Sequence, residues 1–166
     1  MTPHEGLDRF DARELFRALA RHEVAYITIG GIAIQAHGGQ RLTQDLDVTI
    51  AASTDNIARL ARALLDLDAR ILGPDGQRSR SVPSAPLLAS GDQWHLITAY
   101  GPLDVLTLPA HLGSFDDMRA RAHEVPLGDL SIPIASRDDL LKMKRAAGRP
   151  QDLADVRLLE SLDEAT

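Results

Sequence analysis

Two aspartates separated by one residue, Asp45 and Asp47, have the spacing of a metal-binding pair. They open the segment DLDVTI (45–50), whose apolar and β-branched residues predict a strand. Alternate side chains share one face of a strand, so both carboxylates point the same way while Leu46 and Val48 point to the core. Two carboxylates this close repel unless a cation lies between them, and Mg²⁺ prefers oxygen ligands. The pair therefore predicts a metal site, although a bare Asp-x-Asp also occurs on strands that merely face solvent.

A third carboxylate and a glycine pair fit the same site. Asp104 lies in the stretch LDVLTL (103–108), and three acids converge if this strand lies beside the one that carries Asp47. Without the other two carboxylates beside it, Asp104 would be interpreted as a turn residue. Gly30 and Gly31 end an apolar run and precede helical residues, where backbone N–H groups are free and no side chain blocks a phosphate. A tight turn with ordinary helix packing is the alternative.

Two charged residues fall on the apolar faces of predicted helices. Lys144 lies within the apolar stripe of helix 136–147, and Asp155 lies at the centre of the stripe of helix 150–162. A charge facing the core is costly unless it is paired or reaches a cleft. We therefore predict a Lys144–Asp155 ion pair. It either ties the two helices together or also holds the ammonium group near a substrate phosphate.

Among the other predicted elements, helices and strands alternate early in the chain, and strands pair antiparallel later. They are a helix at 7–22, a strand at 24–30, a short helix at 32–38, a helix at 53–67, a long surface loop at 73–92, a hairpin at 93–109 with its turn at 100–102, and strands around 123–127 and 131–136. This order predicts an α/β (α+β) fold, in which helices flank a mixed sheet and two helices follow it. We expect one domain over 1–166, with its core at about 20–135 and a helical part at about 136–162.

Composition limits the partners and the compartment. The net charge of −6 argues against nucleic-acid binding through a broad basic field, but it allows a local basic groove. The chain has no cysteine, no signal-peptide pattern at its amino terminus and no apolar run long enough to span a bilayer, so we expect a cytoplasmic protein without a membrane partner. The candidate groove residues are Arg78, Arg80, Arg137, Lys144, Arg145 and Arg149.

Three segments together resemble the nucleotidyltransferase superfamily with the DNA polymerase β-type palm. They are GGIAIQAHGGQRLTQDLDV, PLDVLTL and KMKRAAGRPQDLADV, and the resemblance spans roughly residues 20 to 160. The frame Arg41-x-Thr43-x-Asp45-x-Asp47 and the tail AAGRPQDLADV look like the AbiEii-like toxins of type IV toxin–antitoxin systems and their small relatives.

The resemblance implies a metal-dependent transfer of a nucleoside monophosphate from an NTP to an acceptor hydroxyl. Asp45, Asp47 and Asp104 would bind two Mg²⁺ ions, with Mn²⁺ as an alternative, and Asp104 would help to deprotonate the acceptor. Gly30 and Gly31 would cradle the phosphates. Thr43, Arg41 and Arg149 would contact the nucleotide, Lys144 would neutralise the leaving pyrophosphate, and Asp155 would support Lys144.

The acceptor stays open between three classes. The first choice is a tRNA 3′ end, modified by a toxin that a cognate antitoxin protein balances. The second is a small hydroxylated molecule such as an antibiotic, which suits an acidic protein. The third is a non-catalytic, antitoxin-like binding protein, against which the complete set of three aspartates argues.

Overall fold

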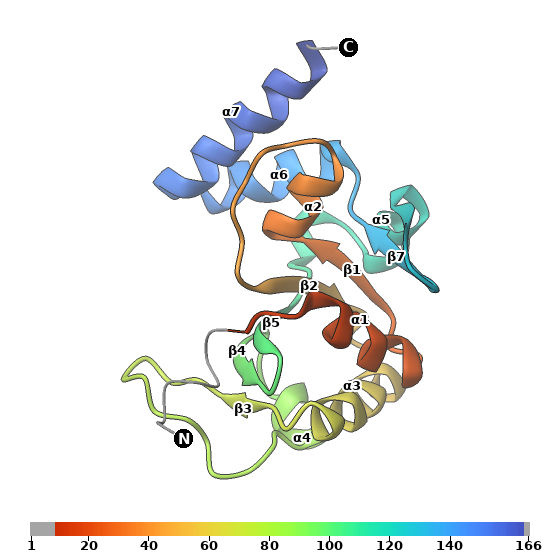
Figure 1. The fold of residues 1–166 in the computed structure, drawn as a ribbon, viewed down its shortest axis with the longest axis vertical. Coiled ribbons are helices and arrows are strands. Elements are labelled where there is room, and N and C mark those ends of the chain that lie inside the picture. Colours follow the sequence, from red (N-terminus) through yellow and green to blue (C-terminus); the bar gives the residue numbers. More distant parts are fainter. Residues whose placement is uncertain (1–8, 165–166) are drawn as a thin grey trace.

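The computed structural model describes residues 9–164, and it contains a seven-stranded mixed sheet with helices around it (Figure 1). The predicted mixed sheet flanked by helices is confirmed. The strand order is β3-β4-β5-β2-β1-β7-β6. The strands are β1 Tyr26–Ile29, β2 Leu46–Ile50, β3 Arg70–Ile71, β4 Gln93–Thr98, β5 Gly101–Thr107, β6 His123–Leu127 and β7 Leu130–Ile134.

The helices occupy both ends of the chain and the connections between strands. They are α1 Ala12–Arg21, α2 Gly30–Ala36, α3 Thr54–Asp66, α4 Ala85–Ala89, α5 Phe115–Arg121, α6 Arg137–Ala147 and α7 Pro150–Glu164, with a 3₁₀ turn at Ala110–Leu112. The α6–α7 pair lies over one end of the sheet, while α1 and α3 lie toward the other end (Figure 1). Among the described residues, no helix has the length and apolar character needed to cross a bilayer.

The centre of the sheet places the carboxylate-bearing strands side by side. β2 runs antiparallel to β1 and parallel to β5, with Asp47 directly opposite Asp104. β4 then pairs antiparallel with β5, and this pairing puts His95 opposite Asp104. Directly opposed residues project to the same face of a sheet, so the register itself gathers these side chains.

A layer of buried apolar side chains supports the opposite face of these strands. Leu46 and Val48 are fully buried, as predicted, and the ring of Phe16 on α1 stacks on Tyr26 of β1 at 6.1 Å between centroids. Asn56 near the start of α3 is also buried and bonds the backbone of Ala25 in both directions. α1 and α3 therefore anchor the inner strands from beneath and leave the carboxylate face to the site.

The structure corrects several predicted boundaries. The strand with the carboxylates begins at Leu46, so Asp45 immediately precedes it. The helix predicted at 7–22 begins at Ala12, while residues 7 and 8 lie outside the described part of the chain. The hairpin turns at residues 99–100 rather than 100–102, because Gly101, with a φ of +107°, already pairs with Thr98.

The segment 73–92 was predicted as a loop but contains helix α4. The hydroxyl of Ser84 accepts a hydrogen bond from the Leu87 amide, and Pro86 lies in the first turn, where its missing N–H costs nothing. Leu88 is buried against the body of the protein. The glycine, proline and serine content of the segment concealed a short capped helix that this one leucine anchors.

Candidate active site

Three carboxylates meet at the end of the central strands. One oxygen from each of Asp45, Asp47 and Asp104 lies within 4.8 Å of the others, close enough for a single metal ion to contact all three. Asp47 and Asp104 are brought together by strand register, and Asp45 comes from the residue just before β2. The hydroxyl of Thr43 donates to the Oδ1 of Asp45 at 2.9 Å and so orients that carboxylate.

The carboxylate cluster fits a divalent metal ion. Burial of Asp47 and the neighbouring charges of Asp45 and Asp104 raise the pKa of Asp47 to about 8, although the Lys144 charge acts in the opposite direction. Three oxygen-rich side chains that repel one another form the ligand set that a hard divalent cation prefers. A bound cation would remove this repulsion and bring the pKa back down.

The glycine pair lets the backbone at the start of α2 approach the carboxylates. Gly30 has a φ of +70°, and a Cβ there would lie 2.1 Å from Oδ2 of Asp47. A Cβ on Gly31 would lie 2.7 Å from the Cβ of Thr43. Any larger residue would therefore displace one of these two polar side chains.

The opposite wall of the pocket is a network of buried carboxylates and cations. The Nζ of Lys144 lies 3.0 Å from Asp155 and 3.4 Å from Asp152, so the predicted Lys144–Asp155 ion pair is present. Asp152 also binds the Nε of Arg149 at 2.7 Å, and Asp155 binds the Nε of Arg41 at 2.8 Å. Asp152 and Asp155 are only 2% and 1% exposed.

Electrostatics keep Asp152 ionised in spite of its burial. Burial alone raises the pKa of Asp152, but the hydrogen bonds from Arg149 and the charge of Lys144 outweigh it and bring the pKa below its usual range. The hydrogen bond to Asp152 and the charge of Asp152 raise the pKa of Arg149. The wall thus presents permanent positive charge whose position is fixed by α7.

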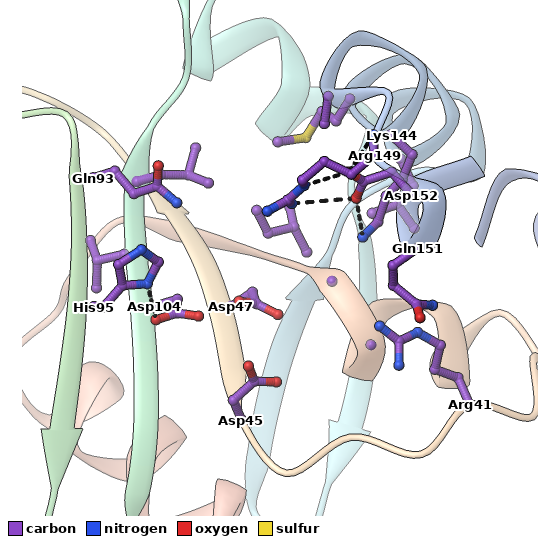
Figure 2. A pocket seen from close by; sticks show the side chains of 18 of the residues that line it. Arg41, Asp45, Asp47, Gln93, His95, Asp104, Lys144, Arg149, Gln151 and Asp152 are labelled. Atoms are coloured by element: carbon purple, nitrogen blue, oxygen red, sulfur yellow. Dashed lines mark hydrogen bonds and ion pairs between the residues drawn. The ribbon is translucent and has the colours of Figure 1, made fainter. Parts of the chain in front are cut away.

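One pocket of about 470 Å³ contains both groups. Figure 2 shows the three aspartates between Gln93 and His95 of β4 on one side and the basic residues on the other. The predicted residues that line it are Gly30, Gly31, Arg41, Asp45, Asp47, Asp104, Lys144 and Arg149. Thr43 and Asp155 contact residues that line the pocket. Thr43 bonds Asp45, and Asp155 pairs with Arg41 and Lys144.

The predicted basic groove is not assembled as a unit. Arg145 pairs with Glu160, and Arg137 donates to the backbone of Leu159, so both bind α7. Arg78 and Arg80 follow β3 and do not line the pocket. Of the six proposed cations, Lys144 and Arg149 face the carboxylates.

Sequence reasoning missed two site residues. His95 was not among the predicted site residues, but it lines the pocket, and its Nδ1 lies 2.8 Å from Asp104. Asp152 was also not among the predicted site residues, but it is a buried partner of both Lys144 and Arg149. The correct pairing of the hairpin strands would have revealed the histidine. No local pattern singled out Asp152, because its role depends on how α7 packs against α6.

The fold occurs in solved nucleotidyltransferase structures. No family model and no curated protein sequence matches the chain. The lincosamide antibiotic adenylyltransferase LnuA, with lincomycin bound, is 18% identical with a TM-score of 0.59, over 93% of this chain and 99% of LnuA. ANT(2″)-Ia, in complex with adenylyl-2″-tobramycin, is 14% identical with a TM-score of 0.58, over 93% of each chain.

A third neighbour has a similar TM-score. An antigenic nucleotidyltransferase-like protein from Paracoccidioides brasiliensis is 18% identical with a TM-score of 0.58, over 92% of this chain and 77% of that one. All three identities are too low to transfer a substrate, but the agreement extends over nearly the whole chain. The chain has the nucleotidyltransferase fold, with its carboxylate cluster in a pocket between the central strands and the last two helices.

Proposed function

We propose that this protein is a metal-dependent nucleotidyltransferase that moves a nucleoside monophosphate from an NTP to an acceptor hydroxyl. One observation carries the proposal: three converging carboxylates face a fixed basic wall across a single pocket. The fold shared with nucleotidyltransferases supports it independently.

The carboxylates would hold Mg²⁺, or Mn²⁺ in its place. Asp45 and Asp47 would bind the ion that accompanies the triphosphate, and Asp104 would complete the site of a second ion. The metal supplies charge neutralisation at the phosphates and lowers the pKa of the attacking hydroxyl. Asp104 accepts the proton of that hydroxyl as its oxygen attacks the α-phosphorus, and the bond to the β-phosphate oxygen breaks to release pyrophosphate.

The remaining residues bind the triphosphate. The Lys144 ammonium and the Arg149 guanidinium neutralise charge that develops on pyrophosphate, while Asp152 and Asp155 fix their positions. Gly30 and Gly31 allow their backbone amides to approach the β- and γ-phosphates. Arg41 lines the same wall, and Thr43 acts by holding Asp45.

Two acceptors are proposed. A small hydroxylated molecule such as an antibiotic is supported by the limited volume of the pocket, by the net charge of −6 and by antibiotic nucleotidyltransferases among the structural neighbours. A tRNA 3′ end, in a toxin with a cognate antitoxin, is supported by the sequence resemblance and by the exposed Arg78 and Arg80 beside β3.

Labelled nucleotides test the proposal directly. The purified protein is incubated with each α-labelled NTP and Mg²⁺, together with either total tRNA or a panel of hydroxylated antibiotics, beside an Asp47→Ala control. Label on either acceptor that is absent with Asp47→Ala supports nucleotidyl transfer and identifies the acceptor class. Equal labelling by both proteins would overturn the metal assignment. No transfer to either class would overturn both proposed acceptors.

A further inference from the structure

A histidine extends the row of carboxylates across three neighbouring strands. Asp47 of β2 lies opposite Asp104 of β5, which lies opposite His95 of β4. The Nδ1 of His95 lies 2.8 Å from the Oδ1 of Asp104 (Figure 2). Since an ionised carboxylate can only accept, the Nδ1 of His95 is the donor in this hydrogen bond.

We propose that His95 is a positioning residue that holds the Asp104 carboxylate in its working orientation, an inference that rests on the proposed function. A bond to one carboxylate oxygen stops rotation of the group and leaves the other oxygen directed to the metal and the acceptor hydroxyl. Thr43 holds Asp45 in the same way, through one oxygen at 2.9 Å. Both flanking carboxylates of the cluster therefore have one oxygen bound by a donor from the protein.

The surroundings of His95 argue against a role in packing. Its side chain is 58% exposed, whereas that of Asp104 is 26% exposed. It lines the pocket, and Asp104 is its hydrogen-bond partner among the described residues. A histidine that only stabilised the β4–β5 hairpin would have no need to bond a carboxylate that lies beside Asp47.

Three substitutions separate positioning from a general effect on the fold. In His95→Asn the amide nitrogen takes the place of Nδ1 and keeps the donor, whereas in His95→Gln the nitrogen lies at the place of Nε2. His95→Ala removes both. His111→Ala, at an exposed histidine outside the pocket, is the matched control.

Binding of Mn²⁺ alone, measured by calorimetry, is the first readout and needs no turnover. We expect His95→Ala and His95→Gln to weaken Mn²⁺ binding about 10-fold, in the range seen when a hydrogen-bond partner of a metal ligand is lost. His95→Asn and His111→Ala should bind like the wild type. A ¹⁵N spectrum of the wild-type protein should show a hydrogen on the Nδ1 of His95.

Turnover is the second readout, on an acceptor that the labelling experiment identifies. His95→Ala should lower kcat about 10- to 100-fold with the KM for NTP unchanged, and His95→Asn should restore most of it. If His95→Ala binds Mn²⁺ like the wild type, or if His95→Asn is as defective as His95→Ala, the proposal is wrong. A wild-type protein that transfers nothing but shows the expected Mn²⁺ pattern overturns the proposed function and leaves the role of His95 supported.

Discussion

Two charged groups of residues face each other across one pocket, and they are stabilised in opposite ways. The carboxylate floor consists of Asp45, Asp47 and Asp104, and the basic wall consists of Arg41, Lys144 and Arg149 with their partners Asp152 and Asp155. On the floor, Asp45, Asp47 and Asp104 crowd together, and burial together with their mutual repulsion raises the pKa of Asp47 to about 8. On the wall, Asp152 and Asp155 are more deeply buried, yet each contacts two cations. Folding alone gives the charged groups of the wall ion-pair partners, whereas the floor needs a cation from outside.

The difference has a simple origin in the secondary structure. Strand register fixes where Asp47 and Asp104 lie whatever their charges, and the energy of the whole sheet opposes their separation. The wall pairs two aspartates of α7 with long cationic side chains that can adjust until they pair. These are Lys144 on α6, Arg149 between α6 and α7, and Arg41 in the segment before β2. Substitutions on the floor should therefore abolish binding without lowering stability, and substitutions on the wall should lower stability first.

Replacing Asp47 should give the largest effect. If it had no effect on binding, the contrast between floor and wall would be wrong. Asp47→Ala removes the carboxylate at the centre of the cluster, and we expect NTP·Mg²⁺ binding to be lost and kcat to fall about 10³-fold, because a catalytic metal supplies several kcal/mol. Calorimetry and a transfer assay measure the two effects. Asp116→Ala, an exposed acid elsewhere, is the control, and retention of nucleotide binding by Asp47→Ala would contradict the assignment.

Replacing Asp155, in the wall, should lower stability first, whereas replacing Asp47 should abolish binding. Asp155→Ala leaves Arg41 without its buried partner and Lys144 with Asp152 alone, and we expect a loss of about 3–5 kcal/mol in the free energy of unfolding. The matched control is Glu160→Ala, which breaks an exposed pair with Arg145 between the same two helices and should cost about 1 kcal/mol or less. Chemical denaturation measures both, and equal losses would show that burial of the wall contributes nothing.

The sequence predicted the parts of the site that depend on local pattern. The spacing of Asp45 and Asp47 placed both on one side of a strand end, and the misplaced charges in two helices predicted the Lys144–Asp155 pair. These inferences need only the periods of strand and helix, which tertiary structure rarely alters. The side-by-side placement of Asp47 and Asp104 followed once their strands were assumed to be neighbours.

The parts that sequence reasoning missed depend on register. A turn at 100–102 would place Thr98 opposite Asp104, whereas the turn at 99–100 places His95 there. Such a shift moves every cross-strand neighbour, so a small error in the turn conceals a site residue. Asp152 was missed for a related reason, because helix phase alone could not show that Lys144 lies between two carboxylates of α7.

Glycine substitutions sharpen the contrast by changing shape rather than charge. In Gly30→Ala the new Cβ would lie 2.1 Å from the Asp47 carboxylate at a φ of +70°, so we expect Asp47 to move and kcat to fall about 10²-fold, as for other small displacements of catalytic groups. Gly38→Ala is the control, because its φ of +97° is equally strained but nothing lies within 4 Å of its Cβ. Similar stability with a selective loss of Mn²⁺ binding in Gly30→Ala is the expected pattern, and similar Mn²⁺ binding by both variants would contradict it.

The smallest expected effect is a dependence on pH that has opposite signs for stability and for metal binding. Because the pKa of Asp47 is raised to about 8 in the folded, metal-free protein, the folded state holds a proton there that the unfolded chain has lost. The free energy of unfolding without metal should therefore fall as pH rises toward 8. Mn²⁺ must displace that proton, so its affinity should rise over the same interval, by up to about 10-fold per pH unit.

Thermal melts in a chelator and Mn²⁺ titrations at pH 6 and pH 8 measure the two trends. Asp47→Asn is the matched variant, because its amide cannot ionise; without metal it should melt higher than the wild type at pH 8 and lose this part of the pH dependence. Its expected gain in stability follows from the repulsion between Asp47 and its two neighbours, which the amide removes. If Asp47→Asn instead melts lower than the wild type at pH 8, the floor is stabilised by its own charges, and its contrast with the wall is wrong.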